Sequence, residues 1–159
     1  MRLINYNSSI LINLEEAKWN SRSISIVRKV VKVSKLKKNS MSIVLSNDKH
    51  LKSLNYKWKG KNYPTNVLSF PNINNENIEI AKNNYLGDIY LAFETLKKEA
   101  NLGKVIFINH LSHLLIHGIL HLKGYKHDNK SNQKVMQSEE IRILKLLNII
   151  NPYRCNRGV

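Results

Sequence analysis

The sequence has little of several features that define other protein classes. Its only cysteine is Cys155, so no disulfide can form within the chain and a disulfide-stapled fold is excluded. Six glycines and three prolines are too few for a collagen-like or low-complexity chain. The N-terminus has no apolar run before a small-residue cleavage site, so we expect no secretion signal and a cytoplasmic protein.

Long hydrophobic runs are also lacking. The most apolar stretch, residues 105–122, is interrupted by four histidines, an asparagine and a serine. A transmembrane helix needs about 20 predominantly apolar residues, so this stretch does not predict one. Together with a mean hydropathy of -0.37, the pattern predicts a globular chain with no membrane partner.

Acidic residues are scarce, and this imbalance is the most unusual number in the composition. Eleven Asp and Glu stand against 26 Lys and Arg, which leaves a net charge of +15. Residues 72–100 sum to -2, whereas residues 1–40 sum to +7 and residues 101–159 to +6. Such a surplus favours a polyanionic partner such as nucleic acid, or an anionic surface. Asn, Lys and Ile dominate as they would in an AT-rich genome, so compositional drift is an alternative source of part of the charge.

The length of 159 residues and the apolar fraction of 42% predict one domain over residues 1–159, with a flexible tail from about residue 151. We expect an α+β fold in which a small mixed β-sheet of about four strands packs with four to five helices. Expected strands cover 2–12, 42–45, 65–70 and 86–91, and the last two are expected to pair. Two helices are expected directly after capping residues at 13–16 and 47–48, and three more are expected over 94–100, 104–122 and 135–150. A basic loop is expected at 58–64. The helix over 104–122 is apolar on most sides, which predicts the central buried helix with a metal site at its end.

Histidines are concentrated in one short segment, because five of the six lie between His110 and His127. At 100° per residue, His117 and His121 lie about 40° apart on one helical face, one turn from each other. Gly124 can end the helix and turn the chain back, which would bring His127 to the same point. Three imidazoles with a fourth position left for water are typical of a catalytic zinc site.

The spacing H-x-x-x-H-x-x-G-x-x-H is also that of the metzincin zinc proteases. Those enzymes carry a glutamate directly after the first histidine as the general base, and here that position is Gly118. The glycine argues against a protease, and leaves the metal itself or a base from elsewhere to activate water. His110 and His113 share the stripe, but lone helical histidines are more often packing or supporting groups than ligands.

The same residues resemble a known family. The segment 117–127, HGILHLKGYKH, is similar to the H-G-x-L-H-L-x-G-Y-D-H signature of the YbeY family of bacterial zinc-dependent endoribonucleases. Two further blocks resemble that family in the right order: Leu54-Asn55, Gly60-Lys61 and Pro64-Thr65-Asn66-Val67-Leu68-Ser69-Phe70-Pro71, then Leu86-Gly87-Asp88-Ile89.

The resemblance implies an endoribonuclease that cleaves single-stranded RNA, acting in 16S rRNA 3′-end maturation and ribosome quality control. It implies that His117, His121 and His127 bind one Zn²⁺, and that the partners are the 16S rRNA precursor and the ribosome or its small subunit, with no DNA substrate. Two positions depart from the family pattern, since Lys59 stands at an arginine position and Lys126 at an aspartate position. Lys59 keeps the charge that would stabilise a phosphate but loses the bidentate fork of arginine.

Several further residues are candidates for supporting the metal ligands or lining the substrate groove. Asp128 is the nearest replacement for the missing aspartate beside His127, and the other candidates are His113, Thr65, Ser69 and Asp88. Two alternatives to the ribonuclease remain open. One is a metzincin-like metalloprotease, and the other is a non-catalytic protein that binds rRNA or the ribosome and holds a structural metal.

Overall fold

The structure is a computed structural model that describes residues 2–5, 7, 9–72 and 84–154. Most of the Asn-rich linker, at 73–83, and Cys155 lie outside the described residues, as does the end of the expected flexible tail. The chain forms an α+β fold, as predicted. Its elements in order are β1 (Arg2–Asn5), β2 (Ile10–Leu14), α1 (Ser21–Val33), β3 (Ser40–Ser46), α2 (Asp48–Lys59), β4 (Val67–Pro71), β5 (Tyr85–Ala92), α3 (Phe93–Leu102), α4 (Phe107–Leu122) and α5 (Lys130–Leu146).

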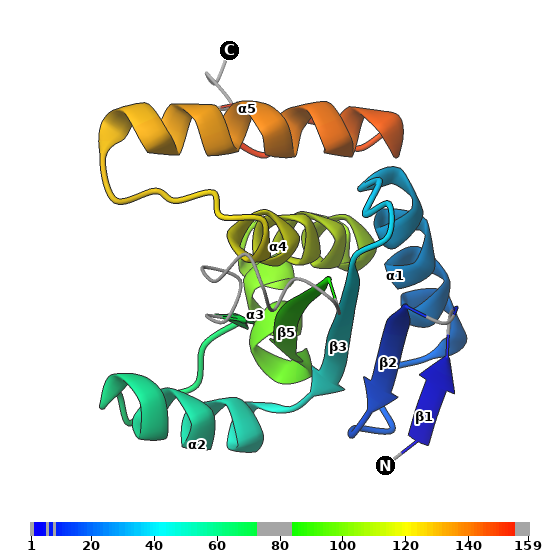
Figure 1. Cartoon of the computed structure of the whole chain (residues 1–159). Helices are drawn as coiled ribbons and strands as arrows, with labels where there is room; N and C mark the ends of the chain where they lie inside the picture. The colour runs from blue at the N-terminus through cyan, green and yellow to red at the C-terminus, as the bar shows by residue number, and fades with distance from the viewer. Residues whose placement is uncertain (1, 6, 8, 73–83, 155–159) are drawn as a thin grey trace.

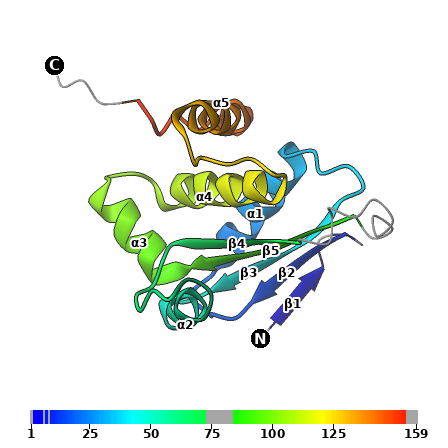
Figure 2. The same cartoon turned by 60° about the vertical axis from the view of Figure 1, so that its left-hand side comes forward.

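One mixed sheet organises the fold (Figure 1), and its strand order is β1-β2-β3-β5-β4, as the labels in Figure 2 show. The three central strands are parallel, and the edge strands β1 and β4 each run antiparallel to their neighbour. The described sheet has five strands where about four were expected, because the segment 2–12 forms two strands. β1 and β2 pair antiparallel, with Ile4 opposite Ile12. The predicted pairing of β4 with β5 is confirmed.

Helices cover both faces of the sheet (Figure 2). α1 and α4 lie on one face, α2 lies on the other, and α5 packs on the outer side of α4. The main core fills the space between the sheet and α1 and α4, and its fully buried side chains include Ile12, Ile43, Ile89, Leu115 and Ile119. α4 is therefore the central buried helix that its apolar sequence predicts.

Two helix starts differ from the sequence prediction, in each case because a different asparagine caps the helix. The expected cap at 13–16 was wrong, since Asn13 and Leu14 continue β2 and α1 begins after Asn20, whose side chain accepts a hydrogen bond from the Ser23 amide. α5 begins five residues earlier than expected, where the Asn129 side chain accepts from the Asn132 amide. The predicted cap at Asn47 is confirmed.

The expected basic loop at 58–64 was partly wrong as well. Trp58 and Lys59 form the last residues of α2, which ends at Gly60 with φ at 67°. A helix interior accepts tryptophan and lysine, and the first residue here that readily takes a left-handed conformation is the glycine. This boundary places Lys59 on the last turn of α2.

Among the described residues, no single helix is long and apolar enough to cross a membrane. α3 and α4 meet that length and hydropathy test only as a pair, across a bend of 118°.

Gly87 allows β4 and β5 to approach each other closely. Its φ is 135°, and an added Cβ would lie 2.1 Å from the Phe70 carbonyl oxygen. We expect Gly87→Ala to lower the free energy of unfolding by on the order of 2–4 kcal/mol, because backbone strain and a backbone clash combine. Urea denaturation measures this loss. The matched control is Gly60→Ala, where φ is also positive but no atom lies within 4 Å, and equal losses in the two variants would contradict the role of the clash.

Candidate metal centre

Three histidines meet at the C-terminal end of α4. His117 and His121 lie one turn apart on that helix, and the chain then turns at Gly124, with the Tyr125 amide donating to the Leu120 carbonyl. This turn brings His127 back, so that one ring nitrogen of each histidine lies within 4.8 Å of the others. The structure therefore brings together the trio that the sequence predicts, positioned to bind a metal ion.

Hydrogen bonds fix which ring nitrogens face the centre. His117 Nδ1 lies 2.6 Å from Glu140 Oε1, and His121 Nδ1 lies 3.0 Å from the Tyr125 carbonyl oxygen. Because a carboxylate and a carbonyl only accept, both Nδ1 atoms donate, and in the neutral rings both Nε2 atoms carry bare lone pairs.

These two Nε2 atoms face each other at 3.0 Å. Two lone pairs at this distance repel unless a cation lies between them. Zinc-bound imidazole nitrogens at about 2.0–2.1 Å in a tetrahedral site would lie about 3.4 Å apart, close to the spacing found here. The donor set therefore fits a metal ion. Burial, followed by the charge of His117, lowers the pKa of His121, which favours the neutral form that a metal requires.

Glu140 is the functional residue that the sequence prediction missed. It projects from α5, is 1% exposed, and contacts His117 through Oε1 and His113 Nε2 through Oε2 at 3.1 Å. The Tyr153 hydroxyl donates to the same Oε2, so the tail as far as this residue packs against the site. Burial opposes ionisation of the carboxyl, but the hydrogen bonds from His113, His117 and Tyr153 lower the pKa of Glu140 to about 2.

A signal for Glu140 is present in the sequence of α5. The buried residues of this helix are Met136, Glu140, Ile143 and Leu144, so a carboxylate occupies its apolar stripe. Charged side chains are rarely buried without a partner, and a lone acid on such a stripe indicates a specific contact. The identity of that contact requires the packing of α5 on α4.

A cavity of about 690 Å³ opens beside the three histidines. Lys59 and Ser69, both predicted, line it together with His117, His121 and His127, and the sequence prediction missed its other lining residues: Asn66, Val67, Pro71, Asn72, Leu122, Gly124, Tyr125 and Lys126. Cations and polar groups from α2, β4 and the turn after α4 thus surround the centre.

The remaining predicted residues lie elsewhere, and none of them lines this cavity. Asp88 accepts a hydrogen bond from the Tyr85 hydroxyl at 2.5 Å, and Asp128 is exposed and accepts from Asn132 Nδ2 at 2.7 Å. Thr65 precedes β4. His113 contacts Glu140, which also contacts His117, so His113 belongs to the hydrogen-bond network behind the centre. His110 contacts Glu99 at 2.7 Å, away from the centre.

Gly118 faces the sheet. A Cβ at this position would lie 3.0 Å from Ser69 Oγ and 3.1 Å from a side-chain carbon of Ile89. A glutamate here would have no room and would not point at the centre, so the general base of the metzincin proteases has no place in this fold. Because Gly118 has no side chain, β4 can lie close against α4, and this brings Ser69 to the cavity.

Comparison with known proteins decides the family. A family model described as Endoribonuclease YbeY matches residues 4–148, nearly the whole chain. This chain belongs to the YbeY family. Relatives named endoribonuclease YbeY occur in Ehrlichia chaffeensis, 39% identical over 153 residues that span 91% of this chain and 96% of the relative, and in Buchnera aphidicola, 36% identical over 156 residues that span 92% and 98%.

A YbeY protein from Bradyrhizobium diazoefficiens is 43% identical over 120 residues, which span 74% of this chain and 66% of that protein. The solution structure of a protein from Thermotoga maritima aligns with a TM-score of 0.52 at 22% identity, covering 93% of this chain and 99% of that one. This likeness supports the fold of the YbeY chain described above.

Proposed function

We propose that this YbeY chain is a zinc-dependent endoribonuclease that hydrolyses single-stranded RNA. The observation that carries the proposal is the geometry of the three histidines. The unprotonated Nε2 atoms of His117 and His121 face each other at 3.0 Å, His127 lies beside them, and a cavity opens next to all three. The name of the family and of its relatives, endoribonuclease, supports RNA as the substrate.

One Zn²⁺ held by the three histidines would make water nucleophilic near neutral pH and polarise a phosphoryl oxygen. The residues of the chain would position the RNA. Lys59 Nζ would stabilise negative charge on the scissile phosphate, and the Ser69 hydroxyl would donate to a phosphate oxygen. Glu140 would act as a positioning residue, because its carboxylate is engaged by His117, His113 and Tyr153.

The surroundings of the cavity suit a flexible single strand. Trp58 and Tyr63, 61% and 54% exposed, flank Lys59 and could stack unpaired bases, which a duplex does not offer. Following the family resemblance, we propose the 3′ end of the 16S rRNA precursor in the small ribosomal subunit as the target, and the cytoplasm as the location.

The proposal is tested with purified protein and labelled RNA that carries a 16S 3′-end sequence. We expect cleavage of the single strand and not of the duplex or of single-stranded DNA, loss of cleavage on chelation, and recovery on adding Zn²⁺. Cleavage of casein in place of RNA would support the metalloprotease alternative. RNA binding without turnover, unaffected by chelation, would support the non-catalytic binding protein instead.

Substitution of Lys59 tests the role of the cation at the cavity. We expect Lys59→Ala to lower kcat by on the order of 10- to 100-fold, since one charged group leaves the developing charge unsupported. Lys59→Arg should raise activity above that of the unmodified chain, because a guanidinium binds phosphate through two parallel hydrogen bonds. Single-turnover cleavage measures both. Lys61→Ala, two residues beyond in the same basic segment, is the control, and an equal loss there would argue that only net charge matters.

A further inference from the structure

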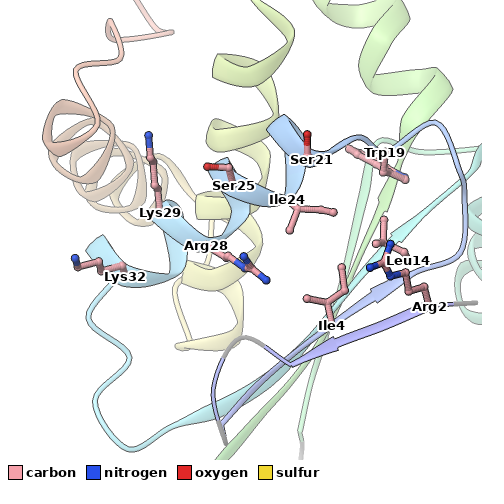
Figure 3. A pocket seen from close by; sticks show the side chains of 10 residues that line it. All are labelled: Arg2, Ile4, Leu14, Trp19, Ser21, Ile24, Ser25, Arg28, Lys29 and Lys32. Carbon is pink, nitrogen blue, oxygen red and sulfur yellow. The ribbon is translucent and has the colours of Figure 1, made fainter.

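A second cavity, of about 570 Å³, lies between α1 and the strands β1 and β2, shown in Figure 3. This edge of the sheet is opposite the edge strand β4 that borders the metal centre. We call it the α1 groove, and its lining residues are Arg2, Ile4, Leu14, Trp19, Ser21, Ile24, Ser25, Arg28, Lys29 and Lys32. The mechanism above makes no use of it.

The charge of the α1 groove has one sign. Four of its lining residues are Lys or Arg and none is acidic, and two serines add hydroxyl groups. The charge of the surrounding sequence is also of one sign, since residues 21–46 contain seven Lys and Arg and no Asp or Glu. Figure 3 shows Arg28 extending from α1 toward Ile4, with Lys29 and Lys32 along the same helix. Cations aligned along a helix favour a polyanion over a single small anion.

A path of further cations joins this groove to the metal centre. Lys123 Nζ, at the end of α4, donates to the Ser34 carbonyl directly after α1 at 2.8 Å. Burial lowers the pKa of Lys123, the nearby carboxylate of Glu139 raises it, and the charges of Arg142 and Lys37 lower it further. Lys126 then lines the cavity beside the histidines. Cations therefore lie at the end of α1 and at the end of α4, between the α1 groove and the histidine cavity.

The groove offers cations and hydroxyls to phosphates but no exposed aromatic ring to bases. Trp19 is 4% exposed and its Nε1 donates to the Ser46 carbonyl at 2.8 Å, so its ring cannot stack on a nucleobase. The exposed large apolar side chains include none on α1, which argues against insertion of this helix into a membrane surface.

From these observations we infer that the α1 groove holds the backbone of single-stranded RNA outside the cleaved segment, independently of sequence. The inference rests on the proposed ribonuclease function and extends it. RNA would cross from the metal centre past Lys123 to α1, so a long substrate would bind more tightly than a short one that reaches only the histidine cavity.

The backbone conformation directly after α1 allows a variant that removes charge without destabilising the fold. Lys35 and Lys37 have φ values of 47° and 55°, a left-handed conformation that favours asparagine or glycine over lysine. Lys35→Asn/Lys37→Asn therefore removes two charges directly after α1 while relieving backbone strain. A loss of RNA binding in this double variant could not be attributed to unfolding.

The test measures affinity by fluorescence anisotropy for RNAs of about 30 and about 8 nucleotides. Lys29→Gln/Lys32→Gln and the double asparagine variant are compared with Lys52→Gln/Lys98→Gln, which removes two exposed lysines on α2 and α3. We expect each of the first two to weaken binding of the long RNA about tenfold at 0.1 M salt, and to lower the slope of log affinity against log salt by about 1.4. Binding and cleavage of the short RNA should stay within twofold, as should all values for the control pair.

Equal losses in all three double variants, or no loss in the first two, would overturn the inference. It would also be overturned if the groove variants lost binding to phosphatidylserine vesicles but not to RNA. If the unmodified protein cleaves neither RNA, the ribonuclease proposal fails by itself, while the anisotropy measurement still decides whether the α1 groove binds RNA.

Discussion

Replacing His121 by alanine is expected to remove zinc binding and to lower RNA cleavage at least about 10³-fold. The imidazole lies between the other two histidines, 3.0 Å from His117 Nε2, so its loss leaves two nitrogens that cannot close a three-ligand site. Without the metal, the cavity lacks the cation that would make water nucleophilic near neutral pH, and Gly118 stands where the metzincins carry their general base. Zinc content after dialysis and single-turnover cleavage of labelled RNA measure the two effects.

The control for this loss is His110→Ala on the same helix. His110 contacts Glu99 and does not line the cavity, so this variant should keep its zinc and cleave within a few-fold of the unmodified rate. Circular dichroism of both variants would show that the fold is intact. A His121→Ala protein that retained stoichiometric zinc and cleaved within tenfold of normal would refute the metal site.

Replacing Glu140 by glutamine is expected to weaken zinc binding about 10- to 100-fold. The carboxylate accepts from His117 Nδ1 at 2.6 Å and holds that ring so that Nε2 faces the centre. A glutamine oxygen can accept one such bond but brings an amide NH₂ where His113 and Tyr153 need an acceptor, so the buried network loses a partner. A zinc titration with a chromophoric competitor measures the affinity.

Two readouts separate positioning from direct catalysis. If Glu140 only orients His117, saturating zinc should restore most of the cleavage rate, whereas a residue that touched the substrate would leave kcat low. Glu139→Gln is the matched control, because Glu139 is the neighbouring acid on α5 and pairs with Arg142 on the surface at 2.7 Å. Equal zinc affinity for Glu140→Gln and Glu139→Gln would show that the buried carboxylate does not support the site.

The same carboxylate makes the stability of the metal-free protein depend on pH. Because the pKa of Glu140 is lowered to about 2 from an ordinary 4.5, its stabilising contribution is complete above pH 4.5 and is lost as the pH falls towards 2. Glu140→Gln should therefore be less stable than the unmodified protein at pH 6, and this difference should shrink between pH 4.5 and 2. Urea denaturation over this range gives the comparison.

The metal site was predictable because most of it is local. His117, His121, Gly124 and His127 lie within eleven residues, and helical geometry with one turn fixes where their rings point. Lys59 was also predicted, although its place at the end of α2 was not. In contrast, Asp88 and Asp128 were named only for their neighbours in sequence, and their carboxylates bind Tyr85 and Asn132.

The sequence by itself determined the α+β class, the buried helix α4, the histidine trio and the excess of positive charge, because periodicity, short spacings and composition are properties of nearby residues. The tertiary structure alone decided three other features. Packing of α5 on α4 brings Glu140 to a histidine 23 residues earlier, and the sheet sets Ser69 against Gly118. It also places four cations at the α1 groove and two, Lys59 and Lys126, at the histidine cavity. Such contacts join segments that are far apart in sequence, and only the folded chain determines which of them meet.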